Sequence, residues 1–255
     1  MNDEAAIDNT NYQVALMRYL SEFNDDKTGK ELKDSLPEFA RIKAIVDRNY
    51  KFRKSVLINK VRDYELTIYL KDELGGIISD SKFTDSLLAD YKSVCHNPEY
   101  IAAIDKLYLR AMSVLPGNAA PEFSLRNAEG KTVSLSSYKG KTVYIDFWAT
   151  WCVPCIAAMP KSKALEEKLK DHRDIVFLYI DVRDDSTRWK NYLAKEKAEG
   201  DHLFADKEQS ANLYRVYNFN GIPHYALLDK NGKIVEANMD GPGDVAEKKI
   251  LKAAK

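Results

Sequence analysis

The chain has 255 residues, enough for one or two domains with cores of their own. The 39 lysines and arginines balance the 39 aspartates and glutamates, and this zero net charge excludes the basic excess typical of nucleic-acid-binding proteins. With 45% hydrophobic and 31% charged residues, the composition is that of a globular protein and excludes collagen-like, disordered and disulfide-dense classes.

The sequence gives no sign of a membrane span or a secretory signal. No stretch approaches the roughly 18 consecutive apolar residues of a spanning helix, and the first residues lack a basic and then apolar pattern. The absence of such segments does not fix the compartment, because the sequence of an exported protein can be given without its signal peptide or lipid anchor. The three cysteines do not form the even framework of a stapled extracellular module, and Cys95 stands alone as an expected buried, small apolar residue.

Residues 1–115 predict a mainly α-helical domain, because apolar residues recur at helical spacing and strand-like alternation is scarce. Two groups show this spacing: Tyr12, Leu16, Tyr19, Leu20 and Phe23, then Phe39, Ile42, Ile45, Val46 and Tyr50. Ser35 with Glu38 predicts a capping box at the start of one helix. Asn97 before Pro98 predicts an N-cap followed by a first-turn proline.

Residues 116–121 hold two prolines and a glycine, and we expect a linker there, before a second domain over 122–255. The elements expected in this domain are strands at 122–125, 131–135, 142–148 and 175–180, helices at 153–170, 187–197 and 208–217, a hairpin of 225–228 and 233–237, and a helix at 245–254. The strand at 142–148, the next helix and the strand at 175–180 predict a right-handed βαβ unit with parallel strands.

The motif WCVPC at 151–155 falls between the first strand and the helix of this unit. Cys152 is therefore expected at a helix N-terminus, where unpaired N–H groups and the helix dipole favour a thiolate, and Cys155 lies one turn further on, where it can resolve a mixed disulfide. A plain staple is one alternative, but it would close almost no loop. Half of a zinc site is another, but it would need a second pair of ligands, and the four histidines are scattered.

The segment at 146–155, with the sequence DFWATWCVPC, resembles the active-site segment of the thioredoxin superfamily. Three further motifs resemble its TlpA/ResA-like branch of thiol-disulfide oxidoreductases: APEFSL at 120–125, LSSYKGK at 135–141 and GIP at 221–223. The resemblance covers about residues 118–255. It implies an α/β thioredoxin fold, with a central mixed sheet flanked by helices, after the helical N-terminal domain.

The resemblance also implies roles for individual residues. Cys152 would be the attacking thiol and Cys155 the resolving thiol. Asp146 would be a buried carboxylate that accepts the proton of the resolving cysteine. The alternative is a solvated strand face, but a central α/β strand is covered on both sides, which favours burial. Substrate contacts are expected from residues around the motif: Trp151, Val153, Pro154, Ile222 and Pro223.

Ile222-Pro223 matches the cis-proline turn that faces the C-x-x-C motif in these folds, with an ordinary trans turn as the alternative. A cis bond would leave the Ile222 backbone free to pair with an extended substrate segment. His224 follows directly, either as a residue that tunes the cysteine pair or as a rim histidine without a role. Trp148 is expected in the core.

We therefore expect a protein thiol-disulfide oxidoreductase that reduces protein disulfides through a Cys152 mixed disulfide, with an upstream electron donor and no cofactor, metal or nucleic acid. Val153-Pro154 between the cysteines resembles reducing proteins more than oxidases of the DsbA type, and a disulfide oxidase or isomerase is an alternative. A further alternative is a partner-binding or dimerising protein in which the C-x-x-C motif is incidental. In either case a homodimer could form through residues 1–115. The resemblance implies a periplasmic or cell-envelope location, with the cytoplasm as the alternative.

Overall fold

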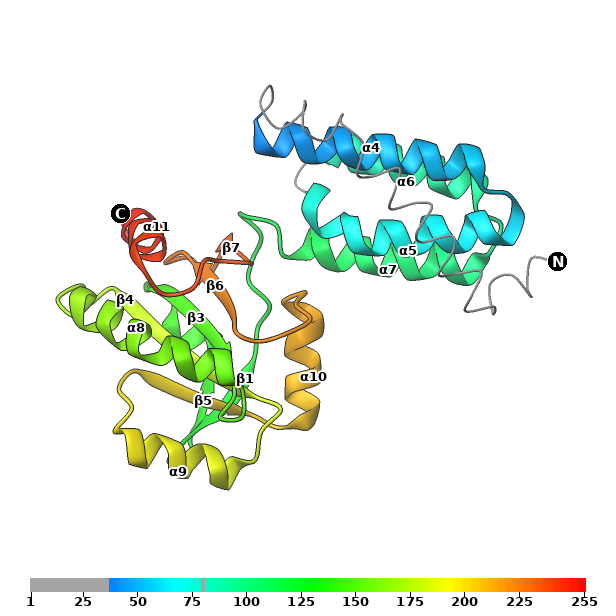
Figure 1. Ribbon diagram of the computed structural model, residues 1–255. Coiled ribbons are helices and arrows are strands. Elements are labelled where there is room, and N and C mark those ends of the chain that lie inside the picture. The colour runs from blue at the N-terminus through cyan, green and yellow to red at the C-terminus, as the bar shows by residue number, and fades with distance from the viewer. Residues whose placement is uncertain (1–36, 79–80) are drawn as a thin grey trace. The chain divides into compact units, whose positions relative to one another are not determined.

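The computed structural model describes residues 37–78 and 81–255 (Figure 1). The chain divides into two compact units, the first ending at Met112 and the second beginning at Ser113. The apolar group predicted from Tyr12 to Phe23 and the capping residue Ser35 lie outside the described residues.

Helices make up the described part of the first unit, which confirms its predicted helical character. They are α4 (Glu38–Val56), α5 (Asn59–Ile77), α6 (Ser81–Val94) and α7 (Pro98–Ser113). At the start of α7, the Asn97 side chain accepts hydrogen bonds from the N–H groups of Glu99 and Tyr100, at 2.9 and 3.3 Å, as an N-cap residue does. The capping-box prediction is wrong, because α4 begins at Glu38 itself, directly after Pro37.

Large side chains fill the core of this helical unit, and some of its polar groups are paired inside it. The Tyr91 hydroxyl shares a hydrogen bond of 2.7 Å with Thr67, and the Arg53 guanidinium lies 4.2 Å from the centre of the Tyr69 ring. Cys95 is buried, as predicted. No helix in the ranges 37–78 and 81–255 combines the length and apolar character needed to cross a bilayer.

The second unit is built on a mixed sheet with the strand order β2-β1-β5-β4-β3-β6-β7. Its strands are β1 (Ser124–Asn127), β2 (Thr132–Ser134), β3 (Thr142–Trp148), β4 (Ile175–Val182), β5 (Asp201–Ala205), β6 (His224–Leu228) and β7 (Ile234–Glu236). β4 runs parallel to β3 and β5, whereas β6 is antiparallel to β3 and to β7. The parallel βαβ unit and the hairpin are therefore confirmed.

Helices cover both faces of this sheet, which buries every residue of β3. They are the 3₁₀ turn η1 (Leu135–Tyr138) and the α-helices α8 (Val153–Leu169), α9 (Ser186–Glu196), α10 (Lys207–Val216) and α11 (Asp244–Ala253). Side chains alternate along a strand, so Tyr144 and Trp148 pack with α8, α9 and α11 on one face. Ile145 and Phe147 pack with α10 on the other.

The segment expected to be a linker, 116–121, runs along β7. The Gly117 N–H donates to the Ile234 carbonyl at 2.7 Å, and the Ile234 N–H donates to the Asn118 carbonyl at 2.8 Å. Val114 and Phe123, on either side of the segment, are buried in the core of the sheet unit. The segment is therefore an edge of the second unit, because its backbone finds hydrogen-bond partners on β7.

Candidate active site

Cys152 and Cys155 form a disulfide at the start of α8, with their Cα atoms 5.2 Å apart. Cys152 is the N-cap residue, and its Sγ accepts a hydrogen bond of 3.3 Å from the Cys155 N–H. Unpaired N–H groups at a helix N-terminus stabilise negative charge, so this position favours the thiolate form of Cys152 in the reduced protein. The turn before it is closed by the Cys152 N–H, which donates to the Ala149 carbonyl at 3.1 Å.

Both cysteines are buried, at 3% and 2% exposure, but their neighbours are not. Trp151 is 50% exposed and Val153 is 79% exposed, so an approaching partner meets these side chains first. The Trp151 indole N–H donates to the Arg183 carbonyl at 2.9 Å, which fixes the orientation of the ring. Trp148 is fully buried, as predicted.

A groove of about 520 Å³ lies beside the motif. Pro154 and the next two turns of α8 form one wall, Tyr225 of β6 contributes to its lining, and residues 240–245 form the other wall. Val245 on this wall is 54% exposed. Most of its lining residues are uncharged, and the charged ones are Lys161, Asp240 and Asp244.

The peptide bond between Ile222 and Pro223 is cis. Ile222 packs against the cluster of side chains that contains both cysteines, so the structure brings this turn and the motif together. His224 faces the other side of the sheet, where its ring stacks on Phe219 with centroids 4.5 Å apart. Burial lowers the pKa of His224 to about 4, and the neutral ring lies on the face opposite the disulfide.

Asp146 is buried in the middle of β3, and its Oδ1 has no hydrogen-bond partner. In register it stands between Tyr179 of β4 and Tyr225 of β6. It shares its strand face with Tyr144 and Trp148, which pack in the same cluster as the two cysteines. Burial raises the pKa of Asp146 to about 8, because no donor or cation compensates the lost hydration of its charge.

Two further carboxyl groups lie near the active-site turn and were not predicted from the sequence. Asp181 of β4 is fully buried, and neither of its oxygens accepts a hydrogen bond. Burial and the charge of Asp184 raise the pKa of Asp181 to about 9, so it holds a proton at neutral pH. Asp184 accepts hydrogen bonds from the N–H and the hydroxyl of Thr150, at 2.7 and 2.5 Å. The carboxyl ends of two parallel neighbouring strands meet at one edge, which is the signal that could have indicated them.

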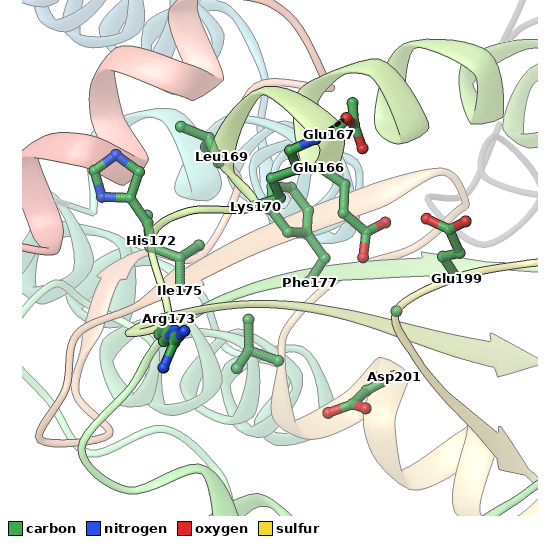
Figure 2. Close-up of a pocket in the computed structure, with 12 residues that line it drawn as sticks. Glu166, Glu167, Leu169, Lys170, His172, Arg173, Ile175, Phe177, Glu199 and Asp201 are labelled. Atoms are coloured by element: carbon green, nitrogen blue, oxygen red, sulfur yellow. Dashed lines mark hydrogen bonds and ion pairs between the residues drawn. The ribbon is translucent and has the colours of Figure 1, made fainter.

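A second hollow, of about 340 Å³, lies at the other end of the sheet, beside the end of α8 and the start of β4 (Figure 2). Figure 2 shows the carboxyl groups of Glu166, Glu199 and Asp201 around it. It contains no cysteine. Among the residues that the structure describes, no group of three or more histidine, cysteine, aspartate or glutamate side chains is placed to hold a metal ion.

A C-x-x-C disulfide that opens a helix after a central strand, opposite an X-Pro turn, defines a site for thiol-disulfide exchange. The Redoxin family matches residues 115–254, more than half of the chain, and the protein belongs to this family. The N-terminal helical unit lies outside the match.

Individual relatives agree with this assignment. The chain is 32% identical over 120 residues to the thiol-disulfide oxidoreductase ResA of Bacillus thuringiensis (strain Al Hakam), over 47% of this chain and 67% of that protein. It is 30% identical to ResA of a Bacillus cereus strain, with the same coverage. A crystal structure of a Bacteroides vulgatus protein described as a thiol-disulfide oxidoreductase matches with a TM-score of 0.51 and 33% identity, over 55% of this chain and 98% of that one. The predicted thioredoxin-like fold and thiol-disulfide oxidoreductase activity are confirmed.

Proposed function

We propose that this protein reduces disulfides in other proteins, with Cys152 as the attacking and Cys155 as the resolving thiol. The Cys152 thiolate attacks a substrate disulfide, forms a mixed disulfide and releases one substrate thiolate. Cys155 then attacks the Cys152 sulfur, which forms the intramolecular disulfide and releases the second substrate thiolate. Two electrons pass to the substrate, and an upstream donor must return them. The position of Cys152 at the N-terminus of α8 carries its assignment as the attacking thiol.

Asp146 is the proposed proton acceptor for Cys155. Cys155 must lose its proton to attack, and a carboxyl group with a pKa of about 8 is a suitable base near neutral pH. Its place on the strand face that packs with the cysteine cluster supports this role.

The proposed substrate surface consists of the side chains that surround the buried sulfur atoms. Exposed Trp151 and Val153 flank Cys152, and Pro154 lines the open groove. The Ile222-Pro223 turn would offer backbone groups to an extended segment of the substrate. Because the sulfur atoms are recessed, we expect a substrate cystine in a flexible, extended segment to react faster than one in a rigid surface.

Replacing Cys155 by serine tests the order of attack. The Cys155→Ser protein should accumulate covalent adducts with a protein disulfide such as insulin, because Cys152 attacks but nothing resolves the product. Mass spectrometry after acid quenching should place the adduct on Cys152. Cys95→Ser, which leaves the motif intact, is the matched control and should form no lasting adduct. Absence of adducts in Cys155→Ser, or adducts on Cys95, would contradict the proposal.

The reductive direction rests on the resemblance of Val153-Pro154 to reducing proteins, and the equilibrium with glutathione tests it. A reduction potential near about −270 mV, the value of thioredoxin, supports a reductant, and one near about −120 mV, the value of DsbA, supports an oxidase.

We also propose a cell-envelope location, which the resemblance to exported relatives supports. Fractionation of cells that express the native gene tests this location.

A further inference from the structure

The turn that leads into Cys152 is held by the turn that follows β4. Both polar groups of Thr150 donate to Asp184 Oδ2, the N–H at 2.7 Å and the hydroxyl at 2.5 Å. The Trp151 indole adds a third bond, to the Arg183 carbonyl at 2.9 Å. Three hydrogen bonds therefore join two loops that lie more than thirty residues apart in the chain.

The turn after β4, at Arg183 and Asp184, is itself held by contacts with α10. Arg183 has a φ of 56°, a left-handed conformation that costs free energy for a residue with a side chain. Its N–H donates to the Ser210 hydroxyl at 3.0 Å, and its guanidinium lies 3.8 Å from the centre of the Tyr214 ring. Such a conformation persists only where its surroundings enforce it, so Asp184 is presented from a rigid support.

The Asp184 side chain is fully buried. Its Oδ1 accepts the Asp185 N–H at 2.7 Å and lies 3.5 Å from the Arg188 guanidinium, which is 60% exposed. Asp181, beside it, holds its proton at neutral pH. Four donor groups therefore face this one carboxyl group and satisfy its oxygen atoms, although the side chain is buried.

We propose that Asp184 is a positioning residue for Cys152, which fixes the Thr150–Trp151 segment and places a buried negative charge near the reactive sulfur. The proposal rests on Cys152 as the attacking thiol. Two effects follow. The hydrogen bonds hold the turn in the geometry from which Cys152 reacts, and the charge opposes the Cys152 thiolate and so favours the disulfide form.

The size of the charge effect follows from the covalent distance. Consecutive Cα atoms are about 3.8 Å apart, so the carboxylate oxygen that lies 2.7 Å from the Thr150 nitrogen is within about 12 Å of the Cys152 Cα atom. At that separation and an effective dielectric constant of about 20, one charge changes the equilibrium between the thiolate and the disulfide by roughly tenfold. The Arg188 guanidinium offsets part of this effect, so we expect a shift of several-fold, up to about tenfold.

The test compares four variants of the full chain by the equilibrium with glutathione and by the rate at which the reduced protein reacts with a small aromatic disulfide. Asp184→Asn keeps the shape of the side chain but removes its charge. It should shift the equilibrium toward the dithiol by up to about tenfold, which makes the reduction potential up to about 30 mV less negative. Thr150→Val loses the hydroxyl donor and should slow the reaction several-fold with an unchanged potential. Thr150→Ser should restore the wild-type rate. Asp185→Asn removes an exposed neighbouring charge and should leave both quantities within twofold of wild type.

The inference is overturned if Asp184→Asn and Thr150→Val both stay within twofold of wild type, or if Asp185→Asn shifts the potential as far as Asp184→Asn. Should Asp184→Asn fail to fold, as circular dichroism would show, equal rates for Thr150→Val and Thr150→Ser overturn it. Cys152→Ser in the same rate assay separates the two proposals. If Cys152→Ser reacts like wild type, the proposed role of Cys152 as the attacking thiol is wrong. If Cys152→Ser is inert but the Asp184 and Thr150 variants behave like wild type, only the inference about Asp184 is rejected.

Discussion

Asp146 has a direct influence on how the stability of this protein depends on pH. Its pKa is about 8 in the folded chain and roughly 3.9 in an unfolded one. Between these values the folded state binds more protons than the unfolded state, so the free energy of unfolding falls as pH rises through this window. The free-energy cost of burying the ionised Asp146 is absent below about pH 4 and complete above about pH 8.

Asp146→Asn should therefore stabilise the protein at high pH. The amide has a similar shape and no charge to bury, so we expect the free energy of unfolding to rise by about 2–4 kcal/mol at pH 8 and to change little at pH 4. Urea unfolding of the oxidised protein at both pH values measures this. An equal change at pH 4 and pH 8 would mean that burial of the charge is not the cause.

The same variant should slow the resolving step of the reaction. Without a base, Cys155 loses its proton less readily, and we expect the release of the second substrate thiolate to slow by at least about tenfold. In the wild type this rate should rise with pH up to about 8, because Asp146 accepts a proton only when ionised. Rapid-quench kinetics across pH 6–9 would measure both, and a variant that keeps the wild-type pH profile would exclude this role.

At the scale of residues, the sequence indicates Cys152, Cys155 and Asp146 because they lie within one short motif on one strand and one helix. Ile222-Pro223 can be placed only by resemblance, since nothing local links it to the motif. The contacts of Asp184 could not be predicted, because they depend on the pairing of β3 with β4 and on the path of the loop after β4.

The helix α10 begins with a reciprocal capping box. The Asp206 side chain accepts the Gln209 N–H at 2.9 Å, and the Gln209 side chain accepts the Asp206 N–H at 3.0 Å. α10 packs on the sheet face opposite the cysteines. Ser210 and Tyr214 of this helix hold Arg183 beside the Asp184 turn, but the Asp206 side chain makes neither contact, so we expect loss of the cap to lower stability and leave the reduction potential unchanged.

Asp206→Ala should lower the free energy of unfolding by about 1 kcal/mol, the usual cost of losing an N-cap. The reduction potential should stay that of the wild type. Asp206→Asn, which can still accept the Gln209 N–H, is the matched control and should lose much less stability. Denaturant unfolding and glutathione titration of the same samples would measure both, and a shift in potential would show that the cap itself influences the active site.

At the scale of elements, the bounds of β3 agree with the prediction because seven buried residues between polar turns leave little choice. β5 was missed because it begins with Asp201 and His202, which do not form an apolar run. It is a strand because β4 and β1 offer backbone partners on both sides, and pairing at that distance in sequence leaves no local signal.

For the whole molecule, the division into two units predicts that the second can act alone. The disulfide, its packing cluster and the Asp184 turn all belong to residues 113–255. A fragment of these residues should fold cooperatively and have the reduction potential of the full chain. Thermal unfolding and glutathione titration would check this, and a fragment that does not fold would show that the helical unit supports it.

The same fragment tests what the helical unit does. If that unit recognises a partner, the fragment should react with a native protein substrate more slowly than the full chain and with a small disulfide at an equal rate. If it forms a homodimer, sizing should show a dimer for the full chain and a monomer for the fragment. The helical character was predictable from apolar spacing, but the sequence contains no motif that names a partner.

Cys95 is buried in the helical unit, and the other two cysteines of the chain are joined in the sheet unit. The oxidised protein therefore has one free thiol, and a labelling reagent reaches it only when the surrounding helices open. The labelling rate of Cys95 then measures the opening equilibrium of the helical unit alone, without any added probe. Comparing this rate with and without a candidate partner would show directly whether binding closes the helices.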